Sequence, residues 1–363
     1  MSVLIIGAGL GGLCLAQGLQ RHGIDATVFE RDASLTARPQ GYRLHVDSRA
    51  DDALRQCLPP DLHDRFRATT SRPSTRITVL SEQLRTLKVI EAPPGFSTSV
   101  DRLTLREILR TGLRDLRFGS HYTHYERLAD DRPRAHFADG TTADGDYLVG
   151  ADGIGSTVRG QYLPHAEIVD TGTRCVYGRT PLAVVENDLP APLWDGFCPV
   201  TDRRKLGLAL GIVQTISENY VMWSLSTQED IPRGKSPAEL HALVSERLRT
   251  WHPTLRRLIQ EATVEATFAI GIRTSVPVEP WTPSRVTLLG DAIHAMPPSQ
   301  GSGANLALFD AARLCTQLTA EDPSIGDYED VLRRVGFAAV RASRDAARGR
   351  GFYRFLRWAT SGR

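Results

Sequence analysis

The spacing of apolar positions predicts a strand, a helix and a second strand at the start of the chain. Residues 3–12 form an apolar run that breaks into Gly-x-Gly-x-x-Gly. Such a run predicts a buried strand that turns directly into a helix, here residues 13–22. Residues 25–30 form a second strand-like run, which ends in an acid. We therefore expect a βαβ unit to open the chain.

The glycine pattern favours a dinucleotide site. Gly7 would allow the tight turn, Gly9 would leave room for a pyrophosphate, and Gly12 would let the helix pack closely on the strand. Unpaired N–H groups at the helix N-terminus would face the anion. Glu30 is placed to bond a ribose hydroxyl. An ordinary βαβ turn is the structural alternative, and the pattern alone does not distinguish NAD from FAD.

An alternating stretch and a set of strand-like runs follow. Residues 41–47 alternate apolar and polar side chains, which predicts an extended segment crossing the nucleotide-binding domain. Arg43 in this stretch fits two interpretations, a surface charge on a strand or a contact with the cofactor. The strand-like region 72–94 is expected to belong to a sheet in another layer.

An amphipathic helix is predicted for residues 102–109, with Asp101 as its N-cap. Arg102 opens this helix, although a positive charge is poorly matched to the N-terminal end of the helix dipole. Its position therefore favours an anionic partner. That partner is either a cofactor phosphate or the carboxylate of Asp101 or Glu107.

A second site near a phosphate is predicted where a later strand ends. Residues 136–142 predict a hairpin, and residues 147–150 predict a strand. The strand leads to Asp152, and Ser156 and Arg159 follow on the next helix. This spacing places a carboxylate at the strand end, with a hydroxyl and a guanidinium one turn apart.

Residues 175–278 are rich in strand-like runs, which predict an antiparallel sheet. One helix, residues 236–251, interrupts them, with Ser236 as its cap. The helix would cover one face of the sheet, and the other face could roof a ligand pocket. Aromatic residues at alternate strand positions also occur as core, so both interpretations apply to the candidates. These candidates are Tyr177, Arg179, Trp194, Phe197, Tyr220 and Trp223.

The stretch 285–305 combines a strand, an acid, two prolines and a glycine-rich helix start. The strand is expected to end at Gly290 and Asp291, where the acid can bind a polyol hydroxyl. Gly301 and Gly303 would bring backbone N–H groups of a helix N-terminus against a ligand. About half a positive charge favours an anion at such a terminus.

A long helix is predicted for residues 328–358, with an apolar stripe on one side and many arginines on the other. We expect this helix to be a clamp packed across two domains. A basic helix that binds a membrane surface or a partner is the alternative.

Length and composition narrow the class of protein. The 363 residues suggest two domains or one domain with a large insertion. The 44 basic and 42 acidic residues nearly cancel, so no nucleic-acid partner is expected. No apolar stretch approaches the roughly 20 residues needed to cross a bilayer, so we expect a cytoplasmic protein without a transmembrane segment. The five scattered cysteines are expected to be packed thiols, and no metal site is predicted.

The order and spacing of these motifs resemble the class A flavoprotein monooxygenases of the p-hydroxybenzoate hydroxylase fold. The resemblance covers nearly the whole chain and rests on Gly7, Gly9 and Gly12 with Glu30, on Arg102 and Leu105, on Asp152 and Gly153 with Arg159, and on Gly290 and Asp291 followed by Pro-Pro and Gly-x-Gly. The stretch Gly-Asp-Ala-x-His-x-Met-Pro-Pro is similar to the tetracycline-inactivating and secondary-metabolite hydroxylases.

This resemblance implies an α/β fold with a Rossmann-like FAD-binding domain, an inserted, mostly antiparallel β-sheet substrate domain and a long C-terminal helix. The FAD-binding domain would be discontinuous and consist of residues 1–70, 98–165 and 280–325. The substrate-binding domain would consist of residues 71–97 and 166–279. A C-terminal bridging helix would occupy residues 326–363.

The resemblance also implies roles for individual residues. The FAD-binding residues would be Gly7, Gly9, Gly11, Gly12, Glu30, Arg31, Arg43, Arg102, Asp152, Gly290, Asp291, Gly301, Gly303, Ala304 and Asn305. The helix start at residues 303–305 would face the flavin N1–C2=O edge, where negative charge collects on reduction. Arg43 and Pro298 would be catalytic residues. Tyr177, Arg179, Phe197, Trp223 and Pro297 would line the substrate pocket, and His294 would belong to the flavin-binding loop.

The implied reaction uses NAD(P)H to reduce FAD, captures O2 as a flavin C4a-hydroperoxide and transfers one oxygen atom to an aromatic or olefinic carbon. The substrate would be an aromatic or polycyclic small molecule, and the protein a monomer or weak homodimer. A reductase of the geranylgeranyl reductase type and a non-catalytic flavoprotein that shelters a reactive intermediate are the alternatives. A flavin-dependent halogenase is disfavoured because its Trp-x-Trp-x-Ile-Pro motif is absent from the sequence.

Overall fold

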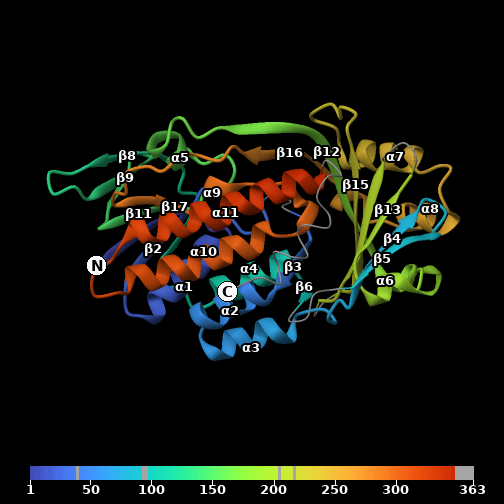
Figure 1. Ribbon diagram of the computed structural model, residues 1–363, viewed down its shortest axis with the longest axis horizontal. Helices are drawn as coiled ribbons and strands as arrows, with labels where there is room; N and C mark the ends of the chain where they lie inside the picture. Colours follow the sequence, from blue (N-terminus) through green and yellow to red (C-terminus); the bar gives the residue numbers. More distant parts are fainter. Residues whose placement is uncertain (38–40, 92–96, 203–205, 216–217, 348–363) are drawn as a thin grey trace.

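The computed structural model describes residues 1–37, 41–91, 97–202, 206–215 and 218–347. Its two main β-sheets lie side by side in an elongated molecule, with the N-terminus in one half (Figure 1). We call the half that contains the N-terminus the nucleotide half and the other the sheet half.

A five-stranded parallel sheet forms the centre of the nucleotide half, in the order β17-β11-β1-β2-β7. Its strands are β1 (Ser2–Ile6), β2 (Asp25–Glu30), β7 (Leu116–Phe118), β11 (Tyr147–Gly150) and β17 (Val286–Leu288). The carboxyl ends of parallel strands meet at one edge, which is where α/β sheets bind ligands. The segments after β1, β11 and β17 therefore lie together.

Helices pack on this sheet, and α1 contacts α2, α4 and α10. The helices of this half are α1 (Leu10–Arg21), α2 (Ser48–Cys57), α3 (Pro60–Ala68), α4 (Arg102–Arg110), α5 (Thr157–Tyr162), α9 (Asp291–His294) and α10 (Gly303–Leu318). Neither α2 nor α3 was predicted from the sequence. Asp47 marks the start of α2, since its carboxylate accepts hydrogen bonds from the backbone of Arg49 and Ala50.

Two small antiparallel sheets complete the nucleotide half. One joins β3 (Arg43–Asp47) to β6 (Ser97–Asp101), and it places Arg43 opposite Asp101. The other contains β8 (Tyr122–Arg127), β9 (Pro133–Phe137) and β10 (Thr142–Asp144). The predicted hairpin at residues 136–142 is the connection between β9 and β10.

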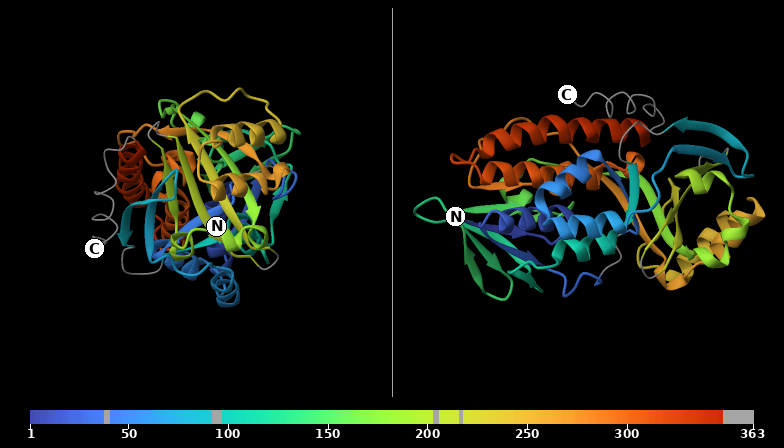
Figure 2. Two further views of the ribbon diagram at one scale, coloured as in Figure 1. Left: turned by 90° about the vertical axis from the view of Figure 1, so that its right-hand side faces the viewer. Right: turned by 90° about the horizontal axis from the view of Figure 1, so that it is seen from below.

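The sheet half contains seven strands in the order β16-β12-β15-β14-β13-β4-β5. These strands are β4 (Arg76–Ser81), β5 (Thr86–Glu91), β12 (Ile168–Pro181), β13 (Cys198–Thr201), β14 (Gly207–Val213), β15 (Tyr220–Thr227) and β16 (Phe268–Ser275). All neighbours are antiparallel except β13 and β4. Figure 2 shows this sheet from its end of the molecule, with helices in front of it.

The prediction of a single helix at residues 236–251 is wrong in its extent, because the chain forms two consecutive helices there. The first, α7 (Pro237–Arg247), begins with the predicted cap and forms a capping box between Ser236 and Glu239. The second, α8 (Pro253–Gln260), starts after His252, whose side chain accepts from the backbone of Thr254. Pro253 fits the first turn of a new helix but not the interior of an old one. A short helix, α6 (Pro192–Asp195), directly precedes β13 along the chain.

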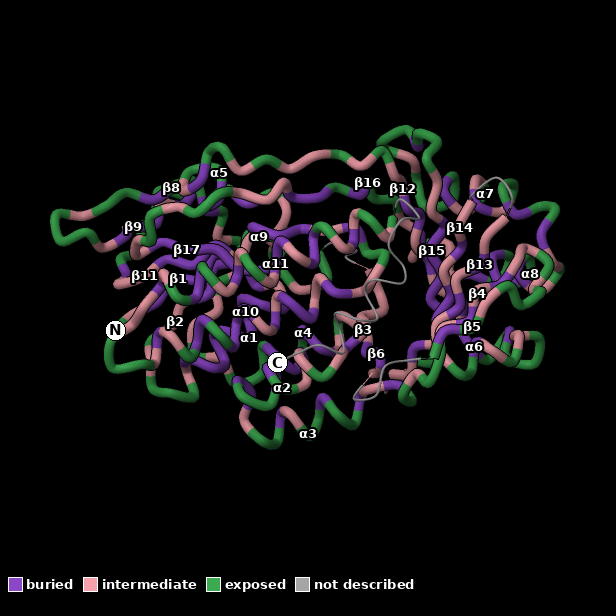
Figure 3. Tube along the Cα trace, in the orientation of Figure 1, coloured by how far each residue is buried: buried purple, intermediate pink, exposed green. Residues whose placement is uncertain are grey.

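Two buried clusters follow the two halves (Figure 3). The larger cluster joins the parallel sheet to its helices and includes Ile5, Leu105 and Val340. The smaller cluster lies between the seven-stranded sheet and α7 and α8, and it includes Trp223 and Trp251. The predicted division into domains at particular residues stays a prediction.

The long C-terminal helix is α11 (Ile325–Ala347), which packs on α9 and α10 and contacts the end of β16. Tyr328, Leu332 and Ala339 of the predicted stripe are buried. The predicted continuation at residues 348–358 lies outside the described residues. Among the helices of the described ranges, none has the length and hydropathy to span a bilayer. All five cysteines are buried and unbridged, as predicted for packed thiols.

Candidate cofactor and substrate site

The glycine loop after β1 has the geometry that its sequence predicts. Gly7 has φ +112°, and a Cβ there would lie 2.4 Å from the carbonyl oxygen of Ala151. A Cβ on Gly12 would lie 2.1 Å from the carbonyl oxygen of Gly7. At Gly9 the nearest atom would be 3.9 Å away, so the space before α1 is open. Gly11 differs from these, since a Cβ there would lie 2.5 Å from Leu289 Cδ1 and its role is close packing.

The acid at the end of β2 supports the same loop. Glu30 is buried, and its Oε2 accepts from the Ala8 backbone N–H at 2.9 Å while Oε1 accepts from Asp32 at 3.0 Å. Arg106 of α4 donates to the Ala8 carbonyl at 2.9 Å, a contact not predicted from the sequence. Its position one helical turn after Arg102 is the pattern that could have indicated it. Arg31 is exposed beside Glu30.

Arg102 and Asp291 lie near one another at the edge where the strands end. The pKa of Arg102 is lowered, because the effect of burial is larger than the opposite effect of the Asp291 charge. Asp291 is exposed, and its carboxylate has no hydrogen-bond partner among the described residues. The carboxylate of Asp101 has other partners, since it accepts from Thr104 at 2.8 Å and from the Tyr220 hydroxyl at 2.6 Å.

The turn before Asp291 is held from behind by a buried pair. Gly290 has φ +61° and ψ −139°, a conformation restricted to glycine, and it donates to Oδ2 of Asp310 at 2.9 Å. Nε2 of His294 lies 2.6 Å from the same oxygen. Burial is the largest single effect and lowers the pKa of His294, but the charge and hydrogen bond of Asp310 together with the charge of Asp291 outweigh it, so the net shift is upward. Asp310 was not predicted, although a lone acid within an apolar helix indicates a buried partner.

The start of α10 faces the same edge. Gly301 is left-handed with φ +61°, and α10 begins at Gly303, where a Cβ would meet only Asp291 Oδ1 at 3.8 Å. The Asn305 side chain is engaged within the protein, because it donates to the carbonyls of His45 and Gly301 and accepts from the Asp47 N–H. Any ligand contact by Ala304 and Asn305 therefore belongs to the backbone. Pro297 is buried, whereas Pro298 is exposed in the turn before Gly301.

Asp152 lies after β11 and caps α5 with one oxygen. Oδ2 accepts from Thr157 at 2.7 Å and from Val158 at 3.3 Å. Oδ1 is buried and lacks a partner in the described part of the chain. Burial raises the pKa of this carboxyl. The prediction of a phosphate-adjacent Arg159 is wrong, because this buried guanidinium donates to the carbonyls of Ala292 at 2.7 Å and Ile154 at 3.0 Å.

The sheet half turns one face toward this edge, and we call it the site face. Its side chains are Tyr177, Arg179, Phe197, Tyr220 and Met222, which gather around Tyr42 of the nucleotide half. Tyr177 stacks on Phe268 with ring centroids 5.5 Å apart. Trp194 lies at the rim and is 47% exposed.

The prediction of Trp223 as a pocket residue is wrong. Trp223 is fully buried on the helix-covered face, over Gly178, and its indole N–H donates to Thr180 Oγ1 at 3.2 Å. Successive strand residues point to opposite faces, so Tyr220 and Met222 face the site while Val221 and Trp223 face the helices.

Arg43 connects the two halves. Its side chain passes over Gly211 of β14, where a Cβ would lie 2.8 Å from Arg43 Cδ. The guanidinium lies 5.2 Å from the centroid of the Phe197 ring. Burial lowers its pKa to about 10. Its buried Nε has no hydrogen-bond partner in the described ranges.

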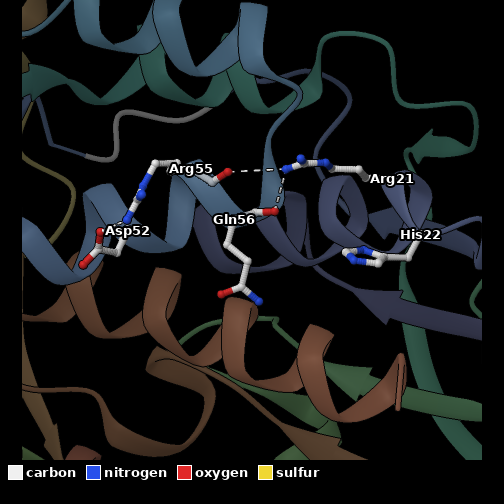
Figure 4. A pocket seen from close by; sticks show the side chains of 5 residues that line it. All are labelled: Arg21, His22, Asp52, Arg55 and Gln56. Carbon is white, nitrogen blue, oxygen red and sulfur yellow. Dashed lines mark hydrogen bonds and ion pairs between the residues drawn. The ribbon is translucent and has the colours of Figure 1, made fainter. Parts of the chain in front are cut away.

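A hollow of about 520 Å³ lies on the surface of the nucleotide half, away from the edge where the strands of the parallel sheet end (Figure 4). Its lining residues are Arg21, His22, Asp52, Arg55 and Gln56. It is at the C-terminal end of α1, roughly 18 Å along the helix from the glycine loop. Arg21 donates there to carbonyls at the end of α2, so it satisfies backbone groups that the helix leaves unpaired.

Comparisons with known proteins place this geometry in a family. The family model described as FAD binding domain matches residues 1–323. The FAD-dependent monooxygenase cctM of Talaromyces islandicus is 30% identical, over 94% of this chain and 90% of that protein. The chain belongs to the FAD-dependent monooxygenase family. The family and FAD predictions are therefore confirmed.

Other relatives of this FAD-dependent monooxygenase family member support the same family assignment. The dual O-methyltransferase/FAD-dependent monooxygenase elcB of Phaeosphaeria nodorum is 34% identical over 93% of this chain but 42% of its own length. The chain thus spans less than half the length of the first curated relatives. A solved structure from Photorhabdus luminescens, described as an FAD-containing monooxygenase, has TM-score 0.84 and 32% identity, covering 95% of this chain and 98% of that one. The predicted fold class is confirmed.

The residues of the site fit FAD. Gly9 leaves the approach to α1 open, as a pyrophosphate requires. The carboxylate of Asp291 and the buried Oδ1 of Asp152 are acceptors without partners in the described residues, suited to cofactor hydroxyls or N–H groups.

Proposed function

We propose that this chain catalyses the NAD(P)H- and O2-dependent hydroxylation or epoxidation of an aromatic or polycyclic small molecule. The observation that carries the proposal is the position of the site face. This aromatic face is linked to the nucleotide half by the Tyr220–Asp101 hydrogen bond of 2.6 Å, and Asp101 is the N-cap of α4, the helix that begins at Arg102. An aromatic substrate can therefore be held beside the cofactor.

When bound, FAD supplies the redox chemistry with NAD(P)H and O2. The chain's own residues bind and orient it. Glu30 and the glycine loop would hold its adenosine half, and Arg102 would meet its phosphates. Asp291 would bind the ribityl hydroxyls, and Asp152 would serve FAD and the transient nicotinamide nucleotide.

Other residues would shape the space where oxygen is transferred. The backbone N–H groups at residues 303–305 would stabilise negative charge on the flavin edge, since a helix terminus is fixed in place before charge develops. Tyr177, Phe197 and Tyr220 would exclude water, and Pro298 would limit the approach to the ring. Arg43 and Arg179 would orient the substrate or the cofactor. No acid–base triad is required for this role.

The relatives' names support a place in secondary metabolism or antibiotic modification. Several fungal relatives combine O-methyltransferase and monooxygenase activities in one protein. Aurachin C monooxygenase/isomerase of Stigmatella aurantiaca is 28% identical over 89% of this chain. We propose further that the protein is a monomer or weak homodimer in the cytoplasm.

Oxygen labelling tests this function. The FAD-loaded protein is given NADH or NADPH, an aromatic substrate panel and labelled O2, and the products are analysed by mass spectrometry. One labelled oxygen atom per product molecule is expected. Substrate turnover that proceeds without O2 would establish a reductase instead. Tight ligand binding without oxygen-dependent turnover would support a non-catalytic flavoprotein.

A further inference from the structure

The start of α4 is held by two tyrosines that pack against the sheet half. The Tyr220 hydroxyl donates to Oδ2 of Asp101 at 2.6 Å, and the Arg102 N–H donates to the Tyr42 carbonyl at 2.7 Å. The other oxygen of Asp101 caps α4, since it accepts from the Thr104 N–H at 2.8 Å. One carboxylate therefore joins a strand of the sheet half to the first turn of a helix in the nucleotide half.

Both tyrosines are fixed by their own contacts. Tyr220 is fully buried, and its ring lies edge-on to the ring of Tyr42, with the centroids 6.1 Å apart. The Tyr42 hydroxyl donates to the carbonyl of Ala266, which lies just before β16. The Arg179 guanidinium lies 5.5 Å from the Tyr220 ring centroid and 5.8 Å from that of Tyr42. Burial, and then the charge of Asp101, raise the pKa of Tyr220, so its hydroxyl keeps its proton and donates to the carboxylate.

The first turn of α4 is an unfavourable place for the arginine that it carries. About half a positive charge lies at a helix N-terminus, and it repels Arg102. Burial lowers the pKa of Arg102, with the charge of Asp291 acting against this shift and that of the buried Arg106 adding to it. An arginine in such a field is held ready for an anion only if its helix start is fixed. The bonds from Tyr42 and Tyr220 supply that restraint.

We propose that Tyr220 is a positioning residue for the cofactor: through the Asp101 carboxylate it holds Arg102 toward the phosphates of FAD. This inference rests on the proposed function, which gives Arg102 its contact with the phosphates. A group that is fixed before its ligand arrives loses less freedom on binding, so affinity rises. A residue of the sheet half therefore sets the affinity of the nucleotide half for FAD.

Titration of the full chain with three ligands tests the proposal. FAD contains phosphates and a flavin, ADP contains phosphates without a flavin, and riboflavin contains the flavin ring and ribityl chain without a phosphate. Calorimetry on protein freed of its FAD measures the dissociation constant of each ligand. Displacement of Arg102 should weaken the binding of FAD and ADP and leave riboflavin unchanged, because only the first two present phosphates to it.

Two variants break the link at different atoms. Tyr220→Phe removes the hydroxyl that donates to Asp101. Asp101→Ser retains an oxygen that caps α4, but its shorter side chain cannot also reach Tyr220. Because each variant loses a hydrogen bond to a charged group, each should raise the dissociation constants of FAD and ADP about fivefold or more. Tyr162→Phe is the matched control, since it removes a tyrosine hydroxyl on α5 that bonds to Thr282 and Glu329, and it should bind all three ligands as the parent does.

A double-mutant cycle shows whether the effect passes through Arg102. Arg102→Gln alone should weaken the binding of FAD and ADP. Tyr220→Phe added to Arg102→Gln should cause no further loss of ADP affinity, because the charge that Tyr220 positions is already absent. A tyrosine that only stabilised the fold would cause the same loss in both backgrounds. Thermal melting of each variant without ligand measures that stability separately.

The outcomes separate this proposal from the proposed function. Unchanged ADP affinity in Tyr220→Phe, an equal loss for ADP and riboflavin, or a full additional loss in the double variant would overturn the positioning role of Tyr220. Unchanged ADP affinity in Arg102→Gln would overturn it as well, together with the phosphate contact of Arg102. A cycle that behaves as expected in a protein that forms no labelled product would retain the positioning role and remove the monooxygenase function.

Discussion

His294 and Asp310 form a fully buried pair behind the cofactor loop, with 2.6 Å between Nε2 and Oδ2. The same Asp310 oxygen accepts from Gly290, so the pair fixes the turn that presents Asp291. Asp310→Asn weakens both contacts. We expect its unfolding free energy to fall by about 1.5–3 kcal/mol and its FAD affinity to fall as well. Chemical denaturation and FAD titration measure the two effects, and unchanged FAD affinity would separate the pair from the cofactor.

The pair also predicts a pH dependence of stability. The pKa of His294 is raised in the folded protein, so its stabilising contribution is complete below the ordinary value near 6.5 and declines as pH rises through the folded pKa. The stability difference between the parent and His294→Gln should therefore shrink from about pH 6 to about pH 9. Denaturation curves at both values measure it. A difference that grows with pH would reverse the assigned direction.

Gly9 and Gly12 make a matched pair of alanine substitutions. A Cβ on Gly12 would lie 2.1 Å from a backbone oxygen, so Gly12→Ala should destabilise the fold strongly. A Cβ on Gly9 has no neighbour closer than 3.9 Å, so Gly9→Ala should fold normally but obstruct the pyrophosphate. Thermal melting without added FAD and FAD titration distinguish the two effects. Normal FAD affinity in Gly9→Ala would show that the pyrophosphate does not bind at this loop.

Asp291→Ala should release FAD and lower the stability of the FAD-free protein much less. The carboxylate is exposed and accepts no hydrogen bond in the described ranges, so within the protein its removal costs only the favourable effect of its charge on Arg102 and His294. A loss of about 1.5–3 kcal/mol corresponds to a dissociation constant roughly ten- to a hundredfold higher. Absorbance after dialysis measures the retained cofactor. Variants that stay yellow would contradict the assignment.

Trp223→Ala should act as a core substitution. The indole is fully buried against α7 and α8, so its loss should reduce the unfolding free energy by about 3–5 kcal/mol. Ligand affinity of the remaining folded protein should be unchanged. Tyr220→Phe is the comparison on the site face, where loss of the Asp101 contact should alter ligand binding more than stability. Calorimetry on both variants gives the comparison.

The sequence predicted the elements whose residues carry strong local patterns. The Gly7 turn, the Asp101 cap and the Ser236 cap were all found, because glycine conformation and capping chemistry depend on neighbours in sequence. Two helices between Asp47 and Thr69 were missed, since their apolar positions are few among many charges.

The site was predicted less completely because its contacts join distant segments. Asp310 acts through Gly290 and His294, and the apolar helix around it indicates that a buried partner exists but not which residue that partner is. Trp223 was misassigned because alternation shows that two faces exist but not which one the helices cover. The crossing of Arg43 over Gly211 depends on a pairing between halves that no local pattern encodes.

The joint between the halves has a mechanical consequence. Only β12 and β16 run as a paired ribbon from one half to the other in the described chain, and their pairing shifts between Asp170 and Arg174, where Gly172 is left-handed (Figure 1). On the nucleotide side the ribbon is anchored by the Ser275 N–H donating to the Ala295 carbonyl at 2.8 Å. A ladder of hydrogen bonds resists stretching but bends at such an irregularity. Bending of the ribbon at residues 170–174 would therefore break no further pairing, whereas drawing the two halves apart along the ribbon would break its ladder of hydrogen bonds.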